Sequence, residues 1–247
     1  IGCVVTGGVS GIGFEVAREL ARLGGAIGII DLHEEAAKSA AFQIEKDCSC
    51  IAAGSAANVA DPDAVGAAFD RLQLQIGPIG VLINCAGIMT PRMLPLTEMS
   101  VSDFQEMLDI HVKGTFICSQ AALPGMQRQS FGRIINISSV VGILGLPLRI
   151  GYATAKAAIS GFTRSLAVEV ARQARLLGGP RARALADELL RQRLLGPVEE
   201  FLGGLVGHQL PLAQQAHVVG HAARQREVVR DHDRGAGLGD RAQPLDQ

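Results

Sequence analysis

Two side chains past the middle of the chain have the types and the spacing to move a proton. Tyr152 and Lys156 are four residues apart, so on a helix they lie one turn apart on the same face. A cation that close favours the phenolate over the phenol, and the pKa of the tyrosine should therefore fall. A phenol with a pKa nearer the working pH is a usable general acid or base. The pair therefore indicates acid–base catalysis.

A glycine-rich turn near the start of the chain has a composition suited to binding phosphate. Residues 1–5 are apolar and β-rich, residues 6–13 contain the glycines, and residues 14–23 have helical periodicity. A strand, a glycine turn and a helix start leave backbone N–H groups facing outward at the positive end of the helix dipole. Glycine also leaves room for a pyrophosphate and for tight packing of the helix on the strand. The candidate cofactor-binding residues in this turn are Gly7, Ser10, Gly11, Ile12 and Gly13.

An acid at the end of the second apolar run indicates the kind of nucleotide. Asp31 comes about twenty residues after the turn, where a carboxylate can accept hydrogen bonds from an adenosine ribose. The same carboxylate would repel a 2′-phosphate, and no lysine or arginine stands at residues 8–10 or at Leu32 to attract one. We therefore predict NAD(H) rather than NADP(H), with Asp31 and Leu32 in its site. The alternative is that Asp31 caps the helix that starts at Glu34.

Strands and helices are expected to alternate along the first 171 residues. Apolar runs predict strands at 1–5, 26–31, 50–53, 79–83 and 133–137, and periodic patterns predict helices at 14–23, 34–46, 61–75, 102–129 and from residue 152. This alternation predicts one α/β domain with a doubly wound, Rossmann-type parallel sheet and helices on both faces. Ligands of such sheets bind at the carboxyl ends of the strands. Every residue singled out above falls at such an end or on the following helix.

Composition excludes several other classes. The net charge of −1 gives no reason to expect nucleic acid or an anionic membrane as a partner. No apolar stretch is long enough to span a bilayer, and no signal peptide is recognisable. Most of the five cysteines lie in apolar patterns, which suits buried thiols in a reducing cytoplasm, so a cytoplasmic protein is expected. Cys48 and Cys50 could form half a metal site, but no matching Cys/His pair follows, and no metal is expected.

Together, the glycine turn, the Tyr/Lys pair and Ser139, which ends the apolar run from residue 134, resemble the short-chain dehydrogenase/reductase family. The sequence is similar to 3-oxoacyl-ACP reductase-like members and to secondary-alcohol dehydrogenases. The resemblance implies that Tyr152 exchanges a proton with the substrate oxygen, that Lys156 binds the nicotinamide ribose, and that Ser139 hydrogen-bonds the substrate oxygen. Ser138 is then expected to be a packed strand-end hydroxyl. The implied reaction is hydride transfer between NAD(H) and a secondary alcohol or ketone.

The resemblance also implies further cofactor positions and an assembly. In the family, the positions that match the ends of the third and fourth strands line the adenine pocket and hold the sheet open. Relatives pair through the long helices after the fourth and fifth strands, so a homodimer or homotetramer is expected. Asn84 could equally be a plain turn residue, and the two roles are compatible. The further cofactor positions are Asn58, Val59, Asn84, Ala86 and Gly87.

His111 departs from the family pattern. The family commonly has an asparagine there, which anchors a water to the lysine. An imidazole can hold a water or carry a proton, but it is bulkier and could disturb the helix kink that the asparagine supports. We expect a reduced or altered proton relay, and His111→Asn should then raise turnover. His111 is therefore included with Ser139, Tyr152 and Lys156 among the candidate catalytic residues.

The last third of the chain does not fit the family. Residues 166–247 contain no Ser, Thr, Lys, Ile, Asn, Tyr, Cys, Met or Trp. Apart from Phe201, they use only residues encoded by codons that begin with C or G, which a wrong reading frame of a G/C-rich gene would give. We therefore divide the chain into a Rossmann-type catalytic domain, 1–171, and an atypical tail, 172–247, which is a possible frame or sequencing artefact. The alternative is a genuine Arg/Ala/Leu-rich helical extension.

Two rival functions stay open. The first is a family member that keeps the cofactor fold but turns over little and acts as a scaffold or binding subunit, which His111 and the atypical tail would explain. The second is a different cofactor-binding enzyme, such as an epimerase or dehydratase, which would bind cofactor without net redox change. The apolar character of residues 89–99 and 142–151, which should border the substrate, favours a hydrophobic or medium-sized ligand.

Overall fold

The structure, a computed structural model, describes residues 1–89 and 93–177, with side chains as far as residue 171. The tail proposed from the sequence therefore lies outside the described residues, apart from the end of the last helix. Both the boundary at residue 171 and the artefact hypothesis stay predictions.

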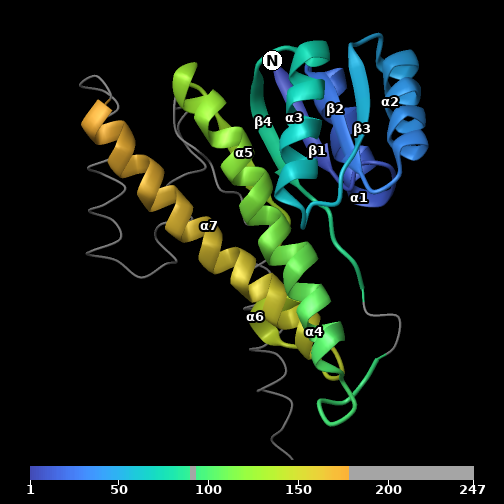
Figure 1. Ribbon diagram of the computed structural model, residues 1–247, viewed down its shortest axis with the longest axis vertical. Coiled ribbons are helices and arrows are strands. Elements are labelled where there is room, and N and C mark those ends of the chain that lie inside the picture. The colour runs from blue at the N-terminus through green and yellow to red at the C-terminus, as the bar shows by residue number, and fades with distance from the viewer. Residues whose placement is uncertain (90–92, 178–247) are drawn as a thin grey trace, which may run out of the picture.

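Five strands form one sheet in which every neighbouring pair runs parallel. The order across the sheet is β3-β2-β1-β4-β5, and Figure 1 labels β3, β2, β1 and β4. Because the order reverses between β1 and β4, the carboxyl ends of these two strands border the switch point where such sheets bind ligands. This arrangement confirms the expected doubly wound, Rossmann-type fold. The strands are β1 (Gly2–Thr6), β2 (Ala26–Asp31), β3 (Ala52–Ala56), β4 (Ile79–Asn84) and β5 (Arg133–Asn136).

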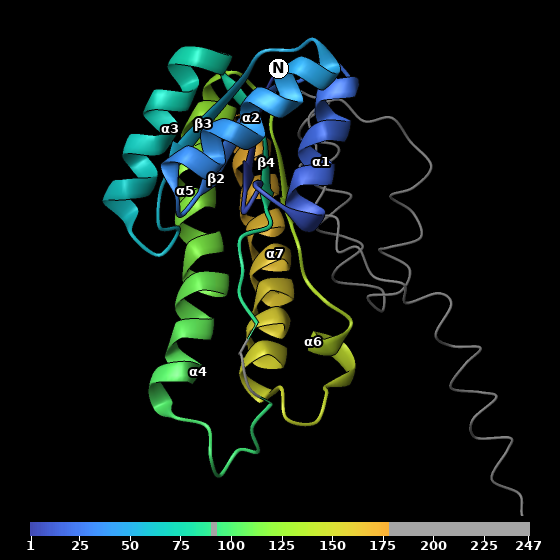
Figure 2. The same cartoon turned by 90° about the vertical axis from the view of Figure 1, so that its right-hand side faces the viewer.

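Helices cover both faces of the sheet because successive strand residues point to opposite sides. In β1, Val5 packs in the cluster under α1 and α2, whereas its neighbour Val4 packs in the cluster under α3 and α5. Figure 2 shows α3 and α5 on one side of the strands and α1 on the other. The helices are α1 (Gly11–Arg22), α2 (Glu34–Cys48), α3 (Pro62–Ile76), α4 (Val101–Leu108), α5 (Gly114–Arg128), α6 (Val141–Leu144) and α7 (Ile150–Leu177), with the π-helical turn η1 (Asp109–Lys113) between α4 and α5.

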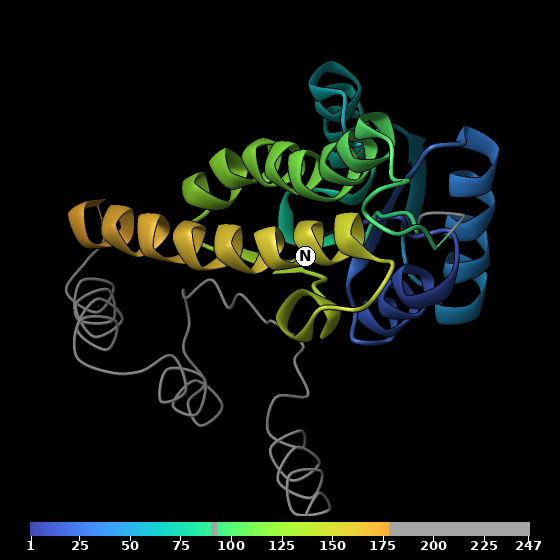
Figure 3. The ribbon, with the colours of Figure 1, turned by 90° about the horizontal axis from the view of Figure 1, so that it is seen from below.

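The long helix after β4 differs from the expected one in two respects. It starts at Val101, and its cap is Ser100, whose Oγ accepts a hydrogen bond from the backbone N–H of Asp103 at 3.0 Å. The expected start at residue 102 was therefore one residue late, and the serine that caps the helix is Ser100. The helix also widens into η1, so α4, η1 and α5 form one rod that continues past the end of the sheet beside α7 (Figures 1 and 3).

Other boundaries shift by a few residues. The third strand begins at Ala52 rather than residue 50, and the last helix begins at Ile150 rather than Tyr152. The short helix α6 was not predicted, because its four residues are too few to show a period. The helix expected from residue 61 begins at Pro62 with Asp61 as its cap, since Asp61 Oδ1 accepts from the backbone N–H of Asp63 at 3.0 Å.

Candidate active site

The ends of β1 and β4 are tied together by one hydroxyl. Thr6 Oγ1 accepts hydrogen bonds from the backbone N–H groups of Cys85, at 3.2 Å, and Ala86, at 3.1 Å. The following Gly7 has φ +66, and a Cβ there would lie 2.8 Å from the Cα of Ala86. The glycine turn and the residues after β4 are therefore in backbone contact, so two parts of the predicted cofactor site lie side by side.

The glycine turn is shaped by backbone contacts. A Cβ on Gly13 would lie 2.2 Å from the carbonyl oxygen of Gly7, so only glycine lets α1 start this close to the strand end. Gly11 has φ +54, and a Cβ there would meet nothing within 4 Å, so this residue faces open space. Ser10 is the N-cap of α1, yet its side chain caps nothing, and the first turn of the helix contains no acid. The first N–H groups of α1 are thus left for an anion.

The acid after β2 lies at the strand end, as expected. Asp31 Oδ1 accepts from the backbone N–H of Leu32 at 2.8 Å, and the N-cap of α2 is His33. The alternative that Asp31 caps α2 is therefore wrong, because its carboxylate turns back to its own neighbour. Both Leu32 and Ile12, on the first turn of α1, are largely exposed.

The candidate residues after β3 and β4 serve packing as well. Asn58 Oδ1 accepts from the backbone N–H of Ala60 at 3.0 Å, which makes it a turn residue, and Val59 is buried against the start of α5. Asn84 is buried, and its amide donates to Asn136 Oδ1 at 2.8 Å and to Ser119 Oγ at 3.2 Å. Asn84 thus links β4 to β5 and α5, while its contact with a cofactor stays a prediction.

The Tyr/Lys pair lies at the end of β5. Lys156 is buried, and its Nζ donates to the carbonyl oxygen of Ile137 at 2.7 Å. The same ammonium lies 5.6 Å from the centroid of the Tyr152 ring, which is half-buried. Burial lowers the pKa of Lys156 from its ordinary value. The predicted pairing of the two side chains on one face of a helix is observed.

The two serines after β5 take different partners. Ser138 Oγ donates to the carbonyl oxygen of Lys156 at 2.9 Å and lies 2.9 Å from Ser160 Oγ, so it fastens the strand end to α7, as expected for a packed hydroxyl. Ser139 Oγ accepts from the backbone N–H of Val141 at 3.2 Å. That bond uses the oxygen of Ser139 and leaves its own hydrogen available to a substrate.

His111 lies inside the π-helical turn and reaches the same place. It is buried, and its ring meets the Tyr152 ring edge-on, with centroids 5.5 Å apart at 83°. Its Nε2 lies 2.8 Å from the carbonyl oxygen of Ile88 and 3.1 Å from the backbone N of the same residue, so the Ile88 backbone holds the ring in either tautomer. Its Nδ1 has no partner in the described part of the protein. Burial lowers the pKa of His111, so its ring is neutral near pH 7.

Gly87 makes room for that ring. A Cβ on Gly87 would lie 2.3 Å from Cε1 of His111 and 2.7 Å from its Nδ1. The bulk that was expected to disturb the helix is therefore accommodated by a glycine on the opposing strand end, and the helix carries its wide turn with His111 in it. The ring is held by β4 on one side and lies against Tyr152 on the other.

A buried polar chain that the sequence did not predict supports these residues. It runs from the carbonyl oxygen of His111 to Thr115 at 2.7 Å, and from the carbonyl oxygen of Thr115 to Ser119 at 2.7 Å. It continues through the Asn84–Asn136 bond to Thr163 on α7 at 2.9 Å. The signal was Asn136 itself, a polar residue inside an apolar strand, because a buried amide requires partners.

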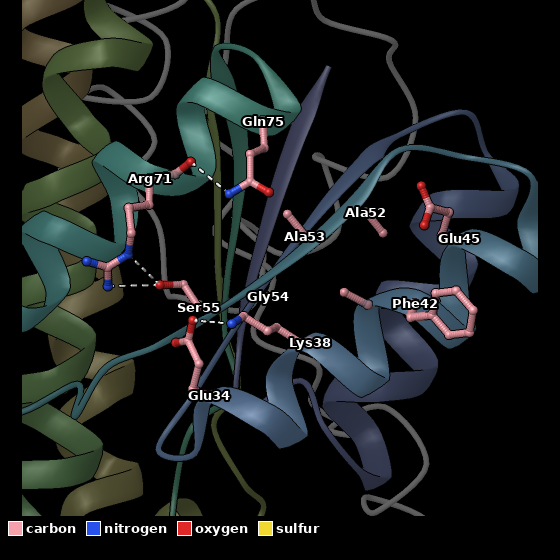
Figure 4. Close-up of a pocket in the computed structure, with 11 residues that line it drawn as sticks. Glu34, Lys38, Phe42, Glu45, Ala52, Ala53, Gly54, Ser55, Arg71 and Gln75 are labelled. Atoms are coloured by element: carbon pink, nitrogen blue, oxygen red, sulfur yellow. Dashed lines mark hydrogen bonds and ion pairs between the residues drawn. The ribbon is translucent and has the colours of Figure 1, made fainter.

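A separate hollow of about 300 Å³ lies at the open edge of β3, between α2 and α3 (Figure 4). Glu34 Oε2 accepts from the backbone N–H of Ala56 at 2.6 Å, and Arg71 Nη2 donates to Ser55 Oγ at 3.0 Å. These charged side chains cover one end of an edge strand, which discourages pairing with another chain. None of the candidate catalytic or cofactor residues lines this hollow.

Among residues 1–89 and 93–177, none of the helices combines the length and the apolar composition that a membrane span requires. The same residues contain no group of three or more His, Cys, Asp or Glu side chains that could hold a metal ion.

Comparison with known proteins connects this geometry to one group. Residues 3–175 match the family model described as short chain dehydrogenase. The chain is 39% identical over 168 residues to 2-dehydro-3-deoxy-L-rhamnonate dehydrogenase (NAD(+)) of Sphingomonas sp. (strain SKA58), a match that covers 68% of this chain and 65% of that protein. The match therefore spans less than two thirds of this relative.

Two further relatives match over a longer stretch. The 3-oxoacyl-(acyl-carrier-protein) reductase FabG of Aquifex aeolicus (strain VF5) is 33% identical over 211 residues, covering 85% of this chain and 82% of that protein. The short-chain reductase protein NovJ of Streptomyces niveus is 36% identical over 226 residues, covering 92% of this chain and 83% of that protein.

Proposed function

The chain belongs to the short-chain dehydrogenase family, and from this premise we propose that it transfers hydride between NAD(H) and a secondary alcohol or ketone, with Tyr152 as the acid/base. The observation that carries the proposal is the position of the Lys156 ammonium. It is buried at the end of β5, bonded to Ile137 O at 2.7 Å and 5.6 Å from the centre of the Tyr152 ring. A positive charge fixed beside a phenol in a buried site suits proton exchange with a substrate oxygen.

The residues at the switch point suit a dinucleotide. The uncapped start of α1 and the open face of Gly11 offer N–H groups to a pyrophosphate, and the contact of Gly13 with Gly7 brings the helix end close to it. Asp31 uses one carboxylate oxygen for Leu32 N–H, which leaves the other for a ribose diol. A carboxylate there repels a 2′-phosphate, which supports NAD(H), as in the relative whose name specifies NAD(+). Asn58, Val59, Ala86 and Gly87 complete the proposed site.

The protein's own groups have separate tasks in this reaction. Bound at the switch point, the nicotinamide supplies or accepts the hydride. In the reduction direction, Tyr152 donates its phenolic proton to the carbonyl oxygen as that oxygen gains charge, and in oxidation it takes the proton back. Ser139 donates its hydroxyl hydrogen to the same oxygen and so orients the substrate. Lys156 supplies positive charge beside the phenolic ring.

His111 bears on whether this turnover is fast. Its neutral ring leaves Nδ1 without a partner among the described side chains and backbone, beside Tyr152, as an acceptor or a donor according to the tautomer. A water held there would stand in for the one that the family asparagine anchors. Without such a water, the second candidate function applies, a cofactor-binding protein with little turnover. Assembly into a homodimer or homotetramer through α5 and α7 also stays a prediction.

The test is NADH oxidation by the purified full chain with a panel of ketones and 3-oxoacyl thioesters, with NADPH as a parallel series. We expect turnover with NADH and a fall of about 10²- to 10⁴-fold in Tyr152→Phe, because the phenolic proton is lost while the ring stays. Full activity in Tyr152→Phe would contradict the proposed acid/base. Cofactor binding without turnover in the unmodified protein would favour the scaffold function, and product formation without net NADH consumption would favour an epimerase or dehydratase.

A further inference from the structure

The segment that leads from Ser139 to the catalytic helix is apolar and exposed. Residues 140–148 contain no charged side chain and no polar one, and no charged residue occurs between Arg133 and Arg149. Between 39% and 64% of the surface of each large apolar residue of this segment other than Val141 is exposed, and Val141 is half-buried. We call these residues, together with the first residue of α7, the apolar ridge: Val140, Ile143, Leu144, Leu146, Leu148 and Ile150.

The apolar ridge has a fixed position relative to the catalytic residues. A Cβ on Gly142 would lie 2.6 Å from the backbone N of Ala157 and 2.7 Å from the carbonyl carbon of Lys156. The backbone of α6 therefore touches that of α7 at the catalytic lysine. On the other side, Ser139 Oγ holds the N–H of Val141, so α6 starts directly from the residue proposed to orient the substrate.

The start of α7 is apolar on its other side as well. A Cβ on Gly151 would lie 3.4 Å from Met107, 3.5 Å from Phe104 and 3.6 Å from Met99. These residues belong to α4 and to the loop before it, so the residue next to Tyr152 is surrounded by thioether and aromatic groups. Figure 2 shows α4 and α6 at the same end of the molecule, on either side of the start of α7.

Hydroxylated or carboxylated substrates need partners that this surface does not offer. A sugar acid brings several hydroxyls and a carboxylate, each of which loses its water at a protein surface and needs a donor or acceptor in return. Ser139 is the one hydroxyl between residues 139 and 148, and the proposed reaction already uses it. Arg149 is engaged within the protein. An alkyl or cycloalkyl group, in contrast, gains free energy from covering the ridge.

We propose that the substrate carries an unsubstituted alkyl chain or carbocycle next to its reacting carbonyl, which covers the apolar ridge, and not hydroxyl or carboxylate groups there. This inference rests on the proposed function. A substrate of this kind differs from the sugar acid for which the Sphingomonas relative is named. The apolar ridge begins one residue after Ser139, the hydroxyl that would orient the carbonyl, and it packs on the helix turn that holds Lys156. A substrate whose carbonyl lies at Ser139 therefore has its neighbouring carbon atoms beside the ridge.

The test is a homologous series of methyl ketones from butanone to 2-octanone, reduced with NADH by the full chain, beside dihydroxyacetone and 4-oxopentanoate. Each buried methylene is worth about 0.8 kcal/mol at most, so kcat/KM should rise by up to about fourfold per methylene. The hydroxylated and carboxylated ketones should lie at least about tenfold below the alkyl ketone of equal length. Leu144→Asn should flatten the rise. Leu74→Asn, on α3 and 89% exposed, is the matched control and should leave it unchanged.

The outcomes separate this inference from the proposed function. Turnover with a flat series, or a preference for the hydroxylated or carboxylated ketones, would overturn the apolar substrate while the redox function stands. An unchanged slope in Leu144→Asn would overturn the role of the ridge, provided that thermal melting shows the variant folded. If Leu144→Asn does not fold, Leu144→Ala takes its place, and it should flatten the slope by a smaller amount. No NADH oxidation with any ketone would overturn the redox function, and the inference with it.

Discussion

The two halves of the switch point are built by different means. Around β1, β2 and β3, the candidate cofactor site is made mainly of backbone, with Gly7, Gly11 and Gly13 setting close approaches and open N–H groups beside the carboxylate of Asp31. Around β4, β5 and α7, the candidate catalytic site is made of side chains, with Lys156 and His111 buried and Ser139 and Tyr152 half-buried. Among the described residues, all buried polar or charged side chains other than Thr6 and Ser55 come from Asn84 onward. The cofactor half therefore depends on glycines that add no Cβ at close backbone contacts. The catalytic half depends on polar side chains that meet their hydrogen-bond partners.

The difference predicts how each half responds to substitution. In the backbone half, adding a methyl group at one of the glycines should lower the free energy of unfolding, whereas removing a polar side chain should change it little. In the side-chain half, the removal of one polar group should leave others unpaired in a buried place, which costs more than the net worth of the bond itself. The following experiments test this contrast.

The largest effect is expected from Lys156→Met. The substitution removes the ammonium beside Tyr152 and leaves Ile137 O without its donor, so kcat should fall by about 10²- to 10³-fold. The measurement is NADH oxidation at saturating ketone. Lys38→Met is the matched control in the other half: Lys38 is an exposed lysine paired with Glu34 at 3.2 Å, and its loss should leave kcat unchanged. Equal losses in the two variants would contradict the contrast.

The next effect is expected from Gly13→Ala. The added Cβ would meet the carbonyl oxygen of Gly7 at 2.2 Å, and backbone cannot move aside cheaply, so the free energy of unfolding should fall by about 3 kcal/mol. Denaturant unfolding measures the loss, and NADH titration should show weaker binding. Gly66→Ala, in α3 with nothing within 4 Å of its Cβ, should instead stabilise the protein by up to about 1 kcal/mol. A tolerated Gly13→Ala would refute the backbone account of this half.

Asn136→Ala tests the buried polar chain. It removes the acceptor of Asn84 Nδ2 and the donor to Thr163 Oγ1, so the free energy of unfolding should fall by about 2 kcal/mol. The measurement is the urea midpoint at constant m-value. Asn58→Ala, an exposed turn residue in the backbone half, should change it by less than about 1 kcal/mol. If both asparagines cost the same, buried polar bonding does not distinguish the halves.

The smallest effect concerns pH. The folded protein lowers the pKa of His111 below 6.5, so below that pH the unfolded chain binds more protons than the folded one. The contribution of His111 to the free energy of unfolding is therefore fully present above pH 6.5 and is lost as the pH falls toward the folded-state pKa of this residue. Unfolding curves between pH 7.5 and 5 should be less pH-dependent in His111→Gln. If His111→Gln gave the same pH dependence as the unmodified protein, this account would be false.

The contrast also explains which features could be predicted from sequence. The glycine turn, Asp31 and the bounds of β2 were predicted from local patterns, because a glycine spacing and an apolar run lie within one stretch of chain. The position of the Tyr152–Lys156 pair on one helix face was predicted for the same reason. The bond of Asn136 to Asn84, and the fit of His111 against Gly87, join residues far apart in sequence, and a single sequence does not show which of them meet. The π-helical turn went unpredicted because its one wide turn leaves the apolar period of the rod nearly intact.

Thr6 lies where the backbone half and the side-chain half meet, and its hydroxyl oxygen is needed by both. One oxygen atom receives the amide hydrogens of Cys85 and Ala86, while the next residue forms the first bend of the glycine turn. Valine has nearly the same shape as threonine but no hydroxyl oxygen. Thr6→Val would therefore leave the backbone N–H groups of Cys85 and Ala86 without this acceptor while the side-chain volume hardly changes. Thr6→Val would thus loosen the contact between the ends of β1 and β4, and with it both the proposed cofactor site and the proposed proton exchange at Tyr152.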